Sequence, residues 1–262
     1  MSQILLNTDL RRESELSRSR DLYLDLLVKV VTNTIYQDPP LQPVGATFKH
    51  ELREKGLDWP SLAHTMSGTE RLNNVRELTQ RVIDDGIRGD LAELGVWRGG
   101  CCILMRGVLA ANGDTSRKVY VIDSFAGLPP PNPEEFPQDK TLTLHTYEDL
   151  AISVGRVKEN FSRYGLLDDQ VIFVEGLFQD TLTDLNAGPF ALIRLDGDMY
   201  ESTYVALEAL YPRVSPGGYI IVDDYGFVPA CRQAVTDYRT RMGIDGRIEK
   251  IDWAGAWWQK TN

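Results

Sequence analysis

Apolar and polar positions alternate along the chain with two periods, and these predict helices and strands over most of its length. Apolar residues recur at helical spacing over residues 21–36, and the sequence Asp38-Pro39-Pro40 stops that helix. A second helix is expected at residues 69–85. From residue 90 onward, short apolar runs of strand length alternate with stretches of helix length. The expected strands are 90–94, 119–122, 171–174, 191–195, 219–222, 248–251 and 256–259, and the expected helices are 100–111, 155–164, 202–211 and 229–242.

The expected strands include continuous apolar runs such as Tyr219-Ile220-Ile221-Val222, which are typical of strands covered on both faces. Their alternation with helices predicts an α/β fold, in which a largely parallel sheet carries helices on both faces. The chain has 262 residues, of which 42% are apolar, and this is enough for one sizeable core.

Three regions are expected along the chain. Residues 1–20 are polar and of mixed charge, so we expect a mobile N-terminal arm. Residues 21–86 are expected to form a helical N-terminal segment that covers the active site, and residues 87–262 to form the core. Residues 126–150 are a long, proline-rich insertion in that core. We expect this insertion and residues 37–60 to form a ligand pocket, because long irregular segments in compact domains are usually functional.

Composition and charge exclude several classes of protein. The net charge is −10, and no stretch of Lys and Arg is long enough to follow a phosphate backbone, so we expect no nucleic-acid partner. Three cysteines without a CxxC pair predict neither a disulfide framework nor a zinc site. The N-terminus does not read as a secretory signal, and no window resembles a membrane span. We therefore expect a cytoplasmic enzyme with no membrane partner.

The turn after the first core strand reads Glu93-Leu94-Gly95-Val96-Trp97-Arg98-Gly99-Gly100. In open α/β sheets, ligands bind beyond the carboxyl ends of the strands, and glycine lets the backbone approach them closely. A dinucleotide fingerprint needs glycine where Trp97 stands, so the motif disfavours NAD. The E-x-G-x-x-x-G pattern instead resembles the cofactor loop of class I S-adenosylmethionine-dependent methyltransferases. A plain structural turn is the alternative.

Asp123 ends the next expected strand, 28 positions after Gly95. A carboxylate there can accept hydrogen bonds from both hydroxyls of a ribose, although a helix N-cap is the other common use of such a residue. The combination of Glu93, Gly95 and Asp123 is more specific than any one of them.

Two later strands each end in a pair of carboxylates, Asp196-Gly197-Asp198 and Asp223-Asp224. If the strands are neighbours, four carboxyl groups meet at one edge, and they cannot all stay ionised without a cation or strong pKa shifts. Oxygen ligands favour a hard ion, most plausibly Mg²⁺. Any single Asp can instead be a helix cap, and Asp198 is the best candidate for that role.

Other chemistry-bearing residues are less informative. His50 and His64 are expected to be structural or surface residues, whereas the choice between Asp198 and His145 as a base stays open. Cys101 and Cys102 are expected to pack in the helix that follows the glycine turn. Trp253, Trp257 and Trp258 are expected in the core or an interface, while Trp59 is a candidate for a substrate mouth.

The motifs together resemble the macrocin O-methyltransferase family over residues 21–259. Those enzymes act on deoxysugars attached to macrolide and aminocoumarin antibiotics. The resemblance rests on the glycine turn, on Asp123-Ser124-Phe125 and on both carboxylate pairs. It also rests on the blocks 21–27, 35–38, 63–66, 71–74 and 160–171. Residues 37–60 and 126–150 look individual, so the resemblance helps least with the identity of the acceptor.

The resemblance implies a class I methyltransferase fold, with a Rossmann-like sheet and an N-terminal helical extension. It implies Mg²⁺ at Asp196, Asp223 and Asp224, with Asp198 as the general base. The reaction is then methyl transfer from S-adenosylmethionine to a deoxysugar hydroxyl of a small-molecule glycoside, in antibiotic biosynthesis. The apolar stripe of the helix at residues 21–36 separately leads us to expect a homo-oligomer. The residues implied around S-adenosylmethionine are Thr65, Met66, Glu93, Gly95, Trp97, Asp123, Ser124, Phe178 and Asp180.

Two other readings remain at this point. One keeps the fold and metal but makes the acceptor a phenol or catechol. The other is a non-catalytic, methyltransferase-like binding protein, against which the complete set of Gly95, Asp123 and four strand-end aspartates argues.

Overall fold

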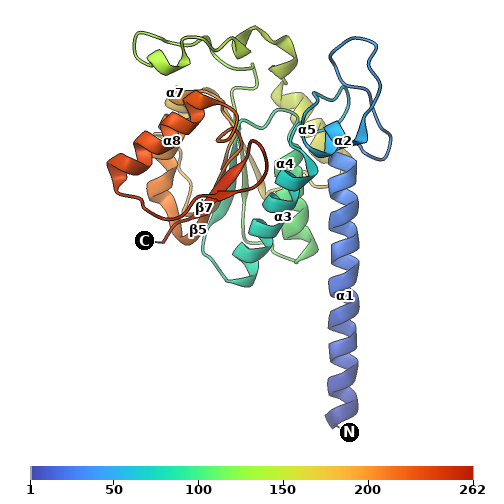
Figure 1. Cartoon of the computed structure of the whole chain (residues 1–262). Helices are drawn as coiled ribbons and strands as arrows, with labels where there is room; N and C mark the ends of the chain where they lie inside the picture. Colours follow the sequence, from blue (N-terminus) through green and yellow to red (C-terminus); the bar gives the residue numbers. More distant parts are fainter. Residues whose placement is uncertain (1, 262) are drawn as a thin grey trace.

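A computed structural model describes residues 2–261 of the chain, with side chains from residue 15 onward, and its centre is a seven-stranded sheet (Figure 1). The strand order is β3-β2-β1-β4-β5-β7-β6, and β1 to β5 pair in parallel. The last two strands run antiparallel to their neighbours. The strands are β1 (Asp90–Leu94), β2 (Val119–Asp123), β3 (Val171–Glu175), β4 (Phe190–Leu195), β5 (Val214–Val222), β6 (Glu249–Lys250) and β7 (Ala256–Gln259).

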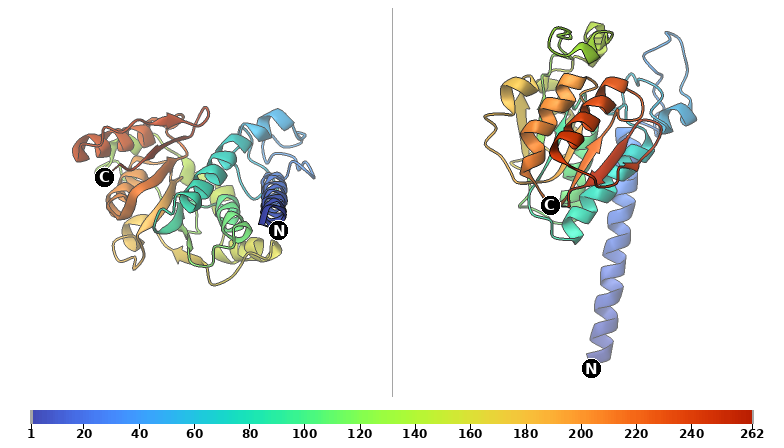
Figure 2. Two further views of the ribbon diagram at one scale, coloured as in Figure 1. Left: turned by 90° about the horizontal axis from the view of Figure 1, so that it is seen from below. Right: turned by 60° about the vertical axis from the view of Figure 1, so that its left-hand side comes forward.

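Helices cover both faces of the sheet, as the apolar strand runs predict (Figure 2). One face packs against α1, α3, α4 and α5, and the other against α7 and α8. The α-helices are α1 (Ser2–Val31), α2 (His50–Glu54), α3 (Thr69–Asp84), α4 (Gly100–Ala111), α5 (Val154–Arg163), α6 (Phe178–Thr181), α7 (Tyr200–Leu210) and α8 (Pro229–Met242). The 3₁₀ turns are η1 (Pro137–Asp139), η2 (Leu144–Thr146), η3 (Glu148–Leu150) and η4 (Tyr211–Arg213). The expected α/β fold is confirmed.

The N-terminal part of the chain differs from the expectation. Residues 2–20 are not a separate irregular arm, because α1 runs without a break from Ser2 to Val31 and its first half projects from the body (Figure 1). The last turns of α1 bury Leu24, Leu27 and Val31 against the core, and this packing holds the helix. Within the described residues, no helix is both long enough and apolar enough to cross a bilayer.

The switch in strand order creates the crevice that the site uses. From β1 the chain continues outward through β2 and β3, and β4 then returns to pair on the other side of β1. Ligands of open α/β sheets bind at such a switch point. Gly95, just after β1, has φ +83°, and a Cβ there would lie 1.8 Å from the backbone oxygen of Asp196. Only glycine therefore lets the ends of β1 and β4 approach this closely.

Candidate active site

Two cavities adjoin at the carboxyl edge of the parallel strands. The second has a volume of about 330 Å³, which lies within the range of small-molecule sites. Five residues line both cavities, so a ligand in one cavity can contact a ligand in the other. The shared positions are Met66, Trp97, Leu150, Asp196 and Asp198.

Asp123, at the end of β2, organises the first cavity. Its Oδ2 accepts hydrogen bonds from the backbone N–H groups of Val96 at 2.7 Å and Trp97 at 3.4 Å, and its Oδ1 accepts one from Phe125 at 2.8 Å. Burial raises the pKa of Asp123, and these backbone donors oppose that rise. The next helical turn begins only at Pro137, so Asp123 is not a helix N-cap. It lines the first cavity at the end of its strand.

Trp97 connects the first cavity to the insertion. Its φ of +48° is unfavourable for an L-residue by about 1–2 kcal/mol, so the surrounding contacts must hold it. The indole Nε1 donates a hydrogen bond to the carbonyl of Asp149 at 2.9 Å, and the guanidinium of Arg98 lies 4.0 Å from the ring centroid. The loop that follows β1 is therefore tied to residues 126–150.

The structure divides the predicted cofactor residues between the two cavities. Six of the nine line the first cavity: Met66, Gly95, Trp97, Asp123, Ser124 and Phe178. Thr65 and Glu93 line the second cavity instead, and Asp180 is exposed on α6 and lines neither. Of the two candidate bases, Asp198 lines both cavities, whereas His145 is exposed and lines neither.

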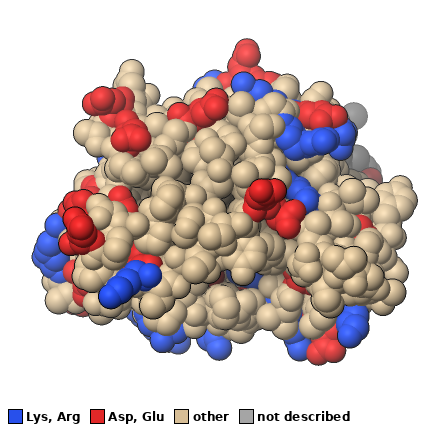
Figure 3. Space-filling view, turned by 90° about the horizontal axis from the view of Figure 1, so that it is seen from above, with Lys and Arg blue, Asp and Glu red and all other residues tan. Residues whose placement is uncertain are grey.

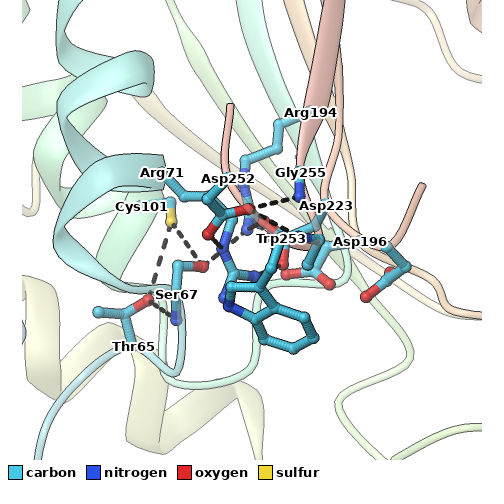
Figure 4. Close-up of polar contacts among 12 residues, drawn as sticks. Thr65, Ser67, Arg71, Cys101, Arg194, Asp196, Asp223, Asp252, Trp253 and Gly255 are labelled. Atoms are coloured by element: carbon cyan, nitrogen blue, oxygen red, sulfur yellow. Dashed lines mark hydrogen bonds and ion pairs between the residues drawn. The ribbon is translucent and has the colours of Figure 1, made fainter. Parts of the chain in front are cut away.

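Two buried arginines converge on Asp223 at the floor of the second cavity (Figure 4). Arg194 of β4 donates to Asp223, to Glu93 and, at 2.8 Å, to Oδ2 of Asp196. Arg71 of α3 donates to the other oxygen of Asp223. Because these groups are shielded from water, their opposite charges must compensate one another. Glu93 thus supports the floor through Arg194.

A late loop completes this floor. Arg71 Nε donates to Asp252 at 3.0 Å, and the other oxygen of Asp252 accepts from the backbone of Ala254 and Gly255 at 2.9 and 2.7 Å. The Arg71 guanidinium lies beside the Trp253 ring, 5.7 Å from the centroid of that ring (Figure 4). The expectation that Trp253 is a core or interface residue is wrong, since it lines the second cavity.

The strand-end aspartates differ in charge environment. Burial works against ionisation of Asp223, but the two guanidinium groups outweigh it and hold the pKa of Asp223 below its usual range. Burial, with repulsion from Asp223, raises the pKa of Asp196 to about 6. Burial and the neighbouring aspartates raise the pKa of Asp198 to about 7 and that of Asp224 well above its usual range. Among the described residues, Asp198 and Asp224 therefore have no guanidinium partner, whereas Asp196 shares Arg194 with Asp223.

The donor set fits a hard divalent cation. Asp196, Asp223 and Asp224 each offer one oxygen, and these atoms lie within 4.8 Å of one another. Carboxylate oxygens are the ligands that Mg²⁺ uses in proteins. A cation there would neutralise Asp224, which has no guanidinium partner among the described residues, and would supplement Arg194 at Asp196, while Asp223 already has two guanidinium partners.

Asp198 is not a helix cap, because another carboxylate has that role. The first turn of α7 is capped by Asp139 of the insertion, whose Oδ1 accepts from Tyr200 N–H at 2.7 Å and whose Oδ2 accepts from Glu201 N–H at 3.0 Å. The N-cap position itself, Met199, contributes no side-chain hydrogen bond. Asp198 has φ +57°, and its carboxyl is left to line both cavities.

The two irregular segments form part of the second cavity. Trp59 and Tyr147 line it, one from residues 37–60 and the other from the insertion, and the role of Trp59 at a substrate mouth stays a prediction. Residues 37–60 are held from inside by the buried Arg53, which pairs with Asp38 at 2.8 Å and Asp58 at 2.9 Å. Seen from the side on which both segments lie, uncharged side chains cover most of the middle of the molecule (Figure 3).

Known proteins share this architecture. The model of the macrocin O-methyltransferase family (TylF) matches residues 20–260. The chain belongs to this family. It is 51% identical over 250 residues to 8-demethyl-8-(2,3-dimethoxy-α-L-rhamnosyl)-tetracenomycin-C 4′-O-methyltransferase of Streptomyces olivaceus, covering 93% of this chain and 94% of that protein. It is 47% identical over 247 residues to mycinamicin III 3″-O-methyltransferase of Micromonospora griseorubida, covering 92% and 97%.

The structural comparison agrees. The O-methyltransferase NovP superimposes with a TM-score of 0.90 at 46% identity, over 93% of this chain and all of that one. The chain is therefore an O-methyltransferase, and the reading as a non-catalytic binding protein is not retained.

Sequence reasoning missed the arginines of this methyltransferase's site. Arg194 is the single charged residue in the fully buried strand β4, and a buried charge needs a partner. That signal was available, although it does not say which carboxylates pair with Arg194. Arg71 shows no such signal, because on an amphipathic helix an arginine is usually exposed.

Proposed function

We propose that this O-methyltransferase transfers a methyl group from S-adenosylmethionine to a hydroxyl of a deoxysugar carried by a natural product, and that it requires Mg²⁺. The observation that carries the proposal is the position of Asp198, where a cavity lined by Asp123 and the Gly95 loop adjoins a cavity with a carboxylate floor. Two close relatives are named for methylation of a rhamnosyl tetracenomycin and of mycinamicin III, which supports a glycoside acceptor.

The protein's part in the reaction is to position the acceptor oxygen and to remove its proton. S-Adenosylmethionine supplies a methyl group on a sulfonium, which is itself the leaving group. The acceptor oxygen forms a bond to the methyl carbon as the carbon–sulfur bond breaks, and the hydroxyl proton passes to Asp198. The products are the methyl ether and S-adenosylhomocysteine. Alignment alone can contribute about 7–11 kcal/mol to such a step.

Asp196, Asp223 and Asp224 are the residues that would hold Mg²⁺. Its charge beside the acceptor would lower the pKa of the hydroxyl. Asp198 does not bind either guanidinium, so it stays available to accept the proton. A cytoplasmic location stays a prediction.

Methyl transfer by the purified protein tests the proposal. We expect S-adenosylmethionine to be consumed with α-L-rhamnosides, and consumption to stop when EDTA removes divalent ions. Simple catechols and phenols form the second arm of the panel. Turnover of catechols but not of glycosides would replace the proposed acceptor class, and full activity in EDTA would remove the metal requirement.

Asp198→Asn tests the assignment of the base. We expect kcat to fall by 10²–10⁴, the usual contribution of general-base catalysis, with S-adenosylhomocysteine binding and melting temperature close to those of the wild type. His145→Asn is the matched control, since His145 is exposed and outside both cavities. A kcat of Asp198→Asn within a few-fold of wild type would remove this residue from the chemistry.

A further inference from the structure

The second cavity has an acidic floor and aromatic residues among its other lining positions. Two edge-on aromatic pairs line it. The rings of Trp59 and Tyr147 are 5.3 Å apart between centroids at an angle of 71°, and those of Phe227 and Trp253 are 5.1 Å apart at 77°. The four side chains come from four separate stretches of the chain, so the fold gathers them at this one cavity.

Each pair combines a half-buried tryptophan ring with an exposed ring. Trp253 Nε1 donates to the carbonyl of Lys55 at 2.7 Å, which holds that ring, and the backbone carbonyl of Trp59 accepts from the N–H of Leu41 at 2.7 Å, which holds the backbone of Trp59. Their partners stay in contact with water, since Phe227 is 64% exposed and Tyr147 is 48% exposed. Large aromatic side chains that the fold leaves exposed beside a cavity indicate a surface that a ligand covers.

The cavity has a polar, acidic part and an apolar, aromatic part. It therefore fits an acceptor that is polar at one end and apolar at the other. The only cationic side chains among its described lining residues, Arg71 and Arg194, already pair with carboxylates. A diphosphate would find no free cationic side chain among these residues, whereas a neutral sugar can turn its hydroxyl groups toward the aspartates. The aromatic pairs suit an apolar group attached to that sugar.

We propose that the two aromatic pairs bind the aglycone of the acceptor, and that Phe227 and Tyr147 determine which aglycones are accepted. This inference rests on the proposed function, because it assumes that the sugar lies at Asp198. In this arrangement the aromatic rings select the aglycone, which does not react. The aspartates of the floor act on the sugar, where the reaction takes place.

Two α-L-rhamnosides that differ only in the aglycone test this inference. For the wild type, kcat/KM should be about a hundredfold higher for a polycyclic aryl rhamnoside than for methyl rhamnoside, because a packed contact with each of the two exposed rings is worth up to about 1.4 kcal/mol, a factor of ten. Phe227→Ala and Tyr147→Ala should each lower this ratio about tenfold, mainly through the KM of the aryl glycoside. Phe227→Tyr should keep the ratio.

Tyr36→Ala is the matched control, since Tyr36 is an exposed aromatic residue that does not line the cavity. If both ratios stay at the wild-type value in Phe227→Ala and Tyr147→Ala, the rings do not bind the aglycone and the inference is wrong. A nucleotide diphosphate rhamnose used better than the aryl rhamnoside would also overturn it. Failure of the wild type to methylate any rhamnoside would instead count against the proposed function.

Discussion

Contacts made by single residues hold the N-terminal segment against the core. Among them, the contact of His64 is the most sensitive to pH. Its Nδ1 lies 2.7 Å from the hydroxyl of Tyr164 at the end of α5, and its carbonyl accepts from Gly100 N–H at 2.8 Å. Burial, with the nearby Arg163 and Arg98, lowers the pKa of His64 to about 4. In the tautomer with a free Nδ1 lone pair, the neutral ring accepts a hydrogen bond from the Tyr164 hydroxyl, and a protonated Nδ1 has no lone pair to do so.

This contact predicts a loss of stability in mild acid. The unfolded chain binds a proton at His64 near pH 6.5 and the folded chain only near pH 4, so the stabilisation is fully present above pH 6.5 and is lost as the pH falls toward 4. After allowance for solvent screening, we expect the contribution of His64 to fall by about 1–2 kcal/mol by pH 5, measured as the difference in unfolding free energy between the wild type and His64→Phe, because the raised pKa values of Asp196 and Asp198 act in the opposite direction in both proteins. Urea denaturation at pH 7.5, 6 and 5 measures it.

His64→Phe keeps the ring but cannot titrate, so its stability should fall less than that of the wild type over this range. At pH 7.5 the variant should lose about 1 kcal/mol for the missing hydrogen bond. His145→Phe, at an exposed position, should keep the wild-type pH dependence. Parallel pH profiles for the wild type and His64→Phe would contradict the assignment.

At the residue scale, the sequence predicted the groups whose place follows from strand ends. Asp123, Asp196 and Asp223 follow apolar strands, and a parallel sheet brings such residues to one edge. Glu93 was assigned to the cofactor by resemblance, but its carboxyl pairs with Arg194. Which carboxylate a buried guanidinium selects depends on tertiary distances of about 3 Å, and no pattern along the chain encodes those.

Among the elements, α7 depends on a residue outside its own sequence. Asp139 is fully buried, and both of its oxygens accept backbone N–H groups of the first turn of α7. That turn follows Asp198 directly, and Asp198 itself has a left-handed backbone conformation. The insertion therefore holds the start of α7 and, through it, the position of the candidate base.

Asp139→Ala should accordingly reduce both stability and turnover. Loss of a cap costs about 0.5–2 kcal/mol, which corresponds to a drop in melting temperature of a few degrees in a protein of this size. We also expect kcat to fall by at least about tenfold, because a small misplacement of a catalytic group is costly. Melting curves and steady-state kinetics at a temperature well below the transition measure the two effects.

Asp114→Ala separates positioning from general destabilisation. Asp114 accepts N–H groups of Ser116 and Arg117 at 2.9 and 3.1 Å, in a turn before β2 and away from both cavities. The Asp114→Ala variant should lose stability as Asp139→Ala does, but its kcat should stay at the wild-type value. An equal kcat in both variants would mean that Asp139 is only structural.

The regular elements were predictable because periodicity along the chain defines them. The expected bounds of β1, α4, α8 and β7 agree with the structure. The short helix α6 and the 3₁₀ turns of the insertion were not predicted, since such elements depend on contacts with distant residues such as the one between Asp139 and α7. The strand β5 starts at Val214, before the expected residue 219, because Val214 already pairs with Phe190 of β4. Pairing resumes at Tyr219 after a register shift.

At the scale of the whole molecule, folding brings together carboxylates that the unfolded chain keeps apart. Asp196, Asp223 and Asp224 place their oxygens within 4.8 Å, so a cation that binds them binds the native state. Such binding stabilises by about 2.7 kcal/mol at a ligand concentration of 100 Kd. With about 2–4 °C per kcal/mol, Mg²⁺ should raise the melting temperature by about 5–10 °C.

Thermal unfolding with Mg²⁺ and with EDTA measures this difference. Asp196→Asn should lose most of the response to Mg²⁺, since it removes an anionic ligand without changing the shape of the side chain. Glu77→Gln, at an exposed position of α3, should respond as the wild type does. A melting temperature of the wild type that is the same in Mg²⁺ and EDTA would contradict the metal site.

The exposed face of α1 predicts that the molecule self-associates. Leu22 is 62% exposed and Leu26 is 53% exposed, and at 100° per residue they lie on one face, opposite the buried Leu24 and Val31. A second copy is the natural partner, because two such faces are self-complementary about a two-fold axis.

Sedimentation should show an oligomer at micromolar concentration, and the double variant Leu22→Glu/Leu26→Glu should sediment as a monomer with an unchanged circular dichroism spectrum. Val44→Glu, at another exposed apolar position, should leave the oligomer intact. A monomeric wild type across this range would show that α1 does not join subunits.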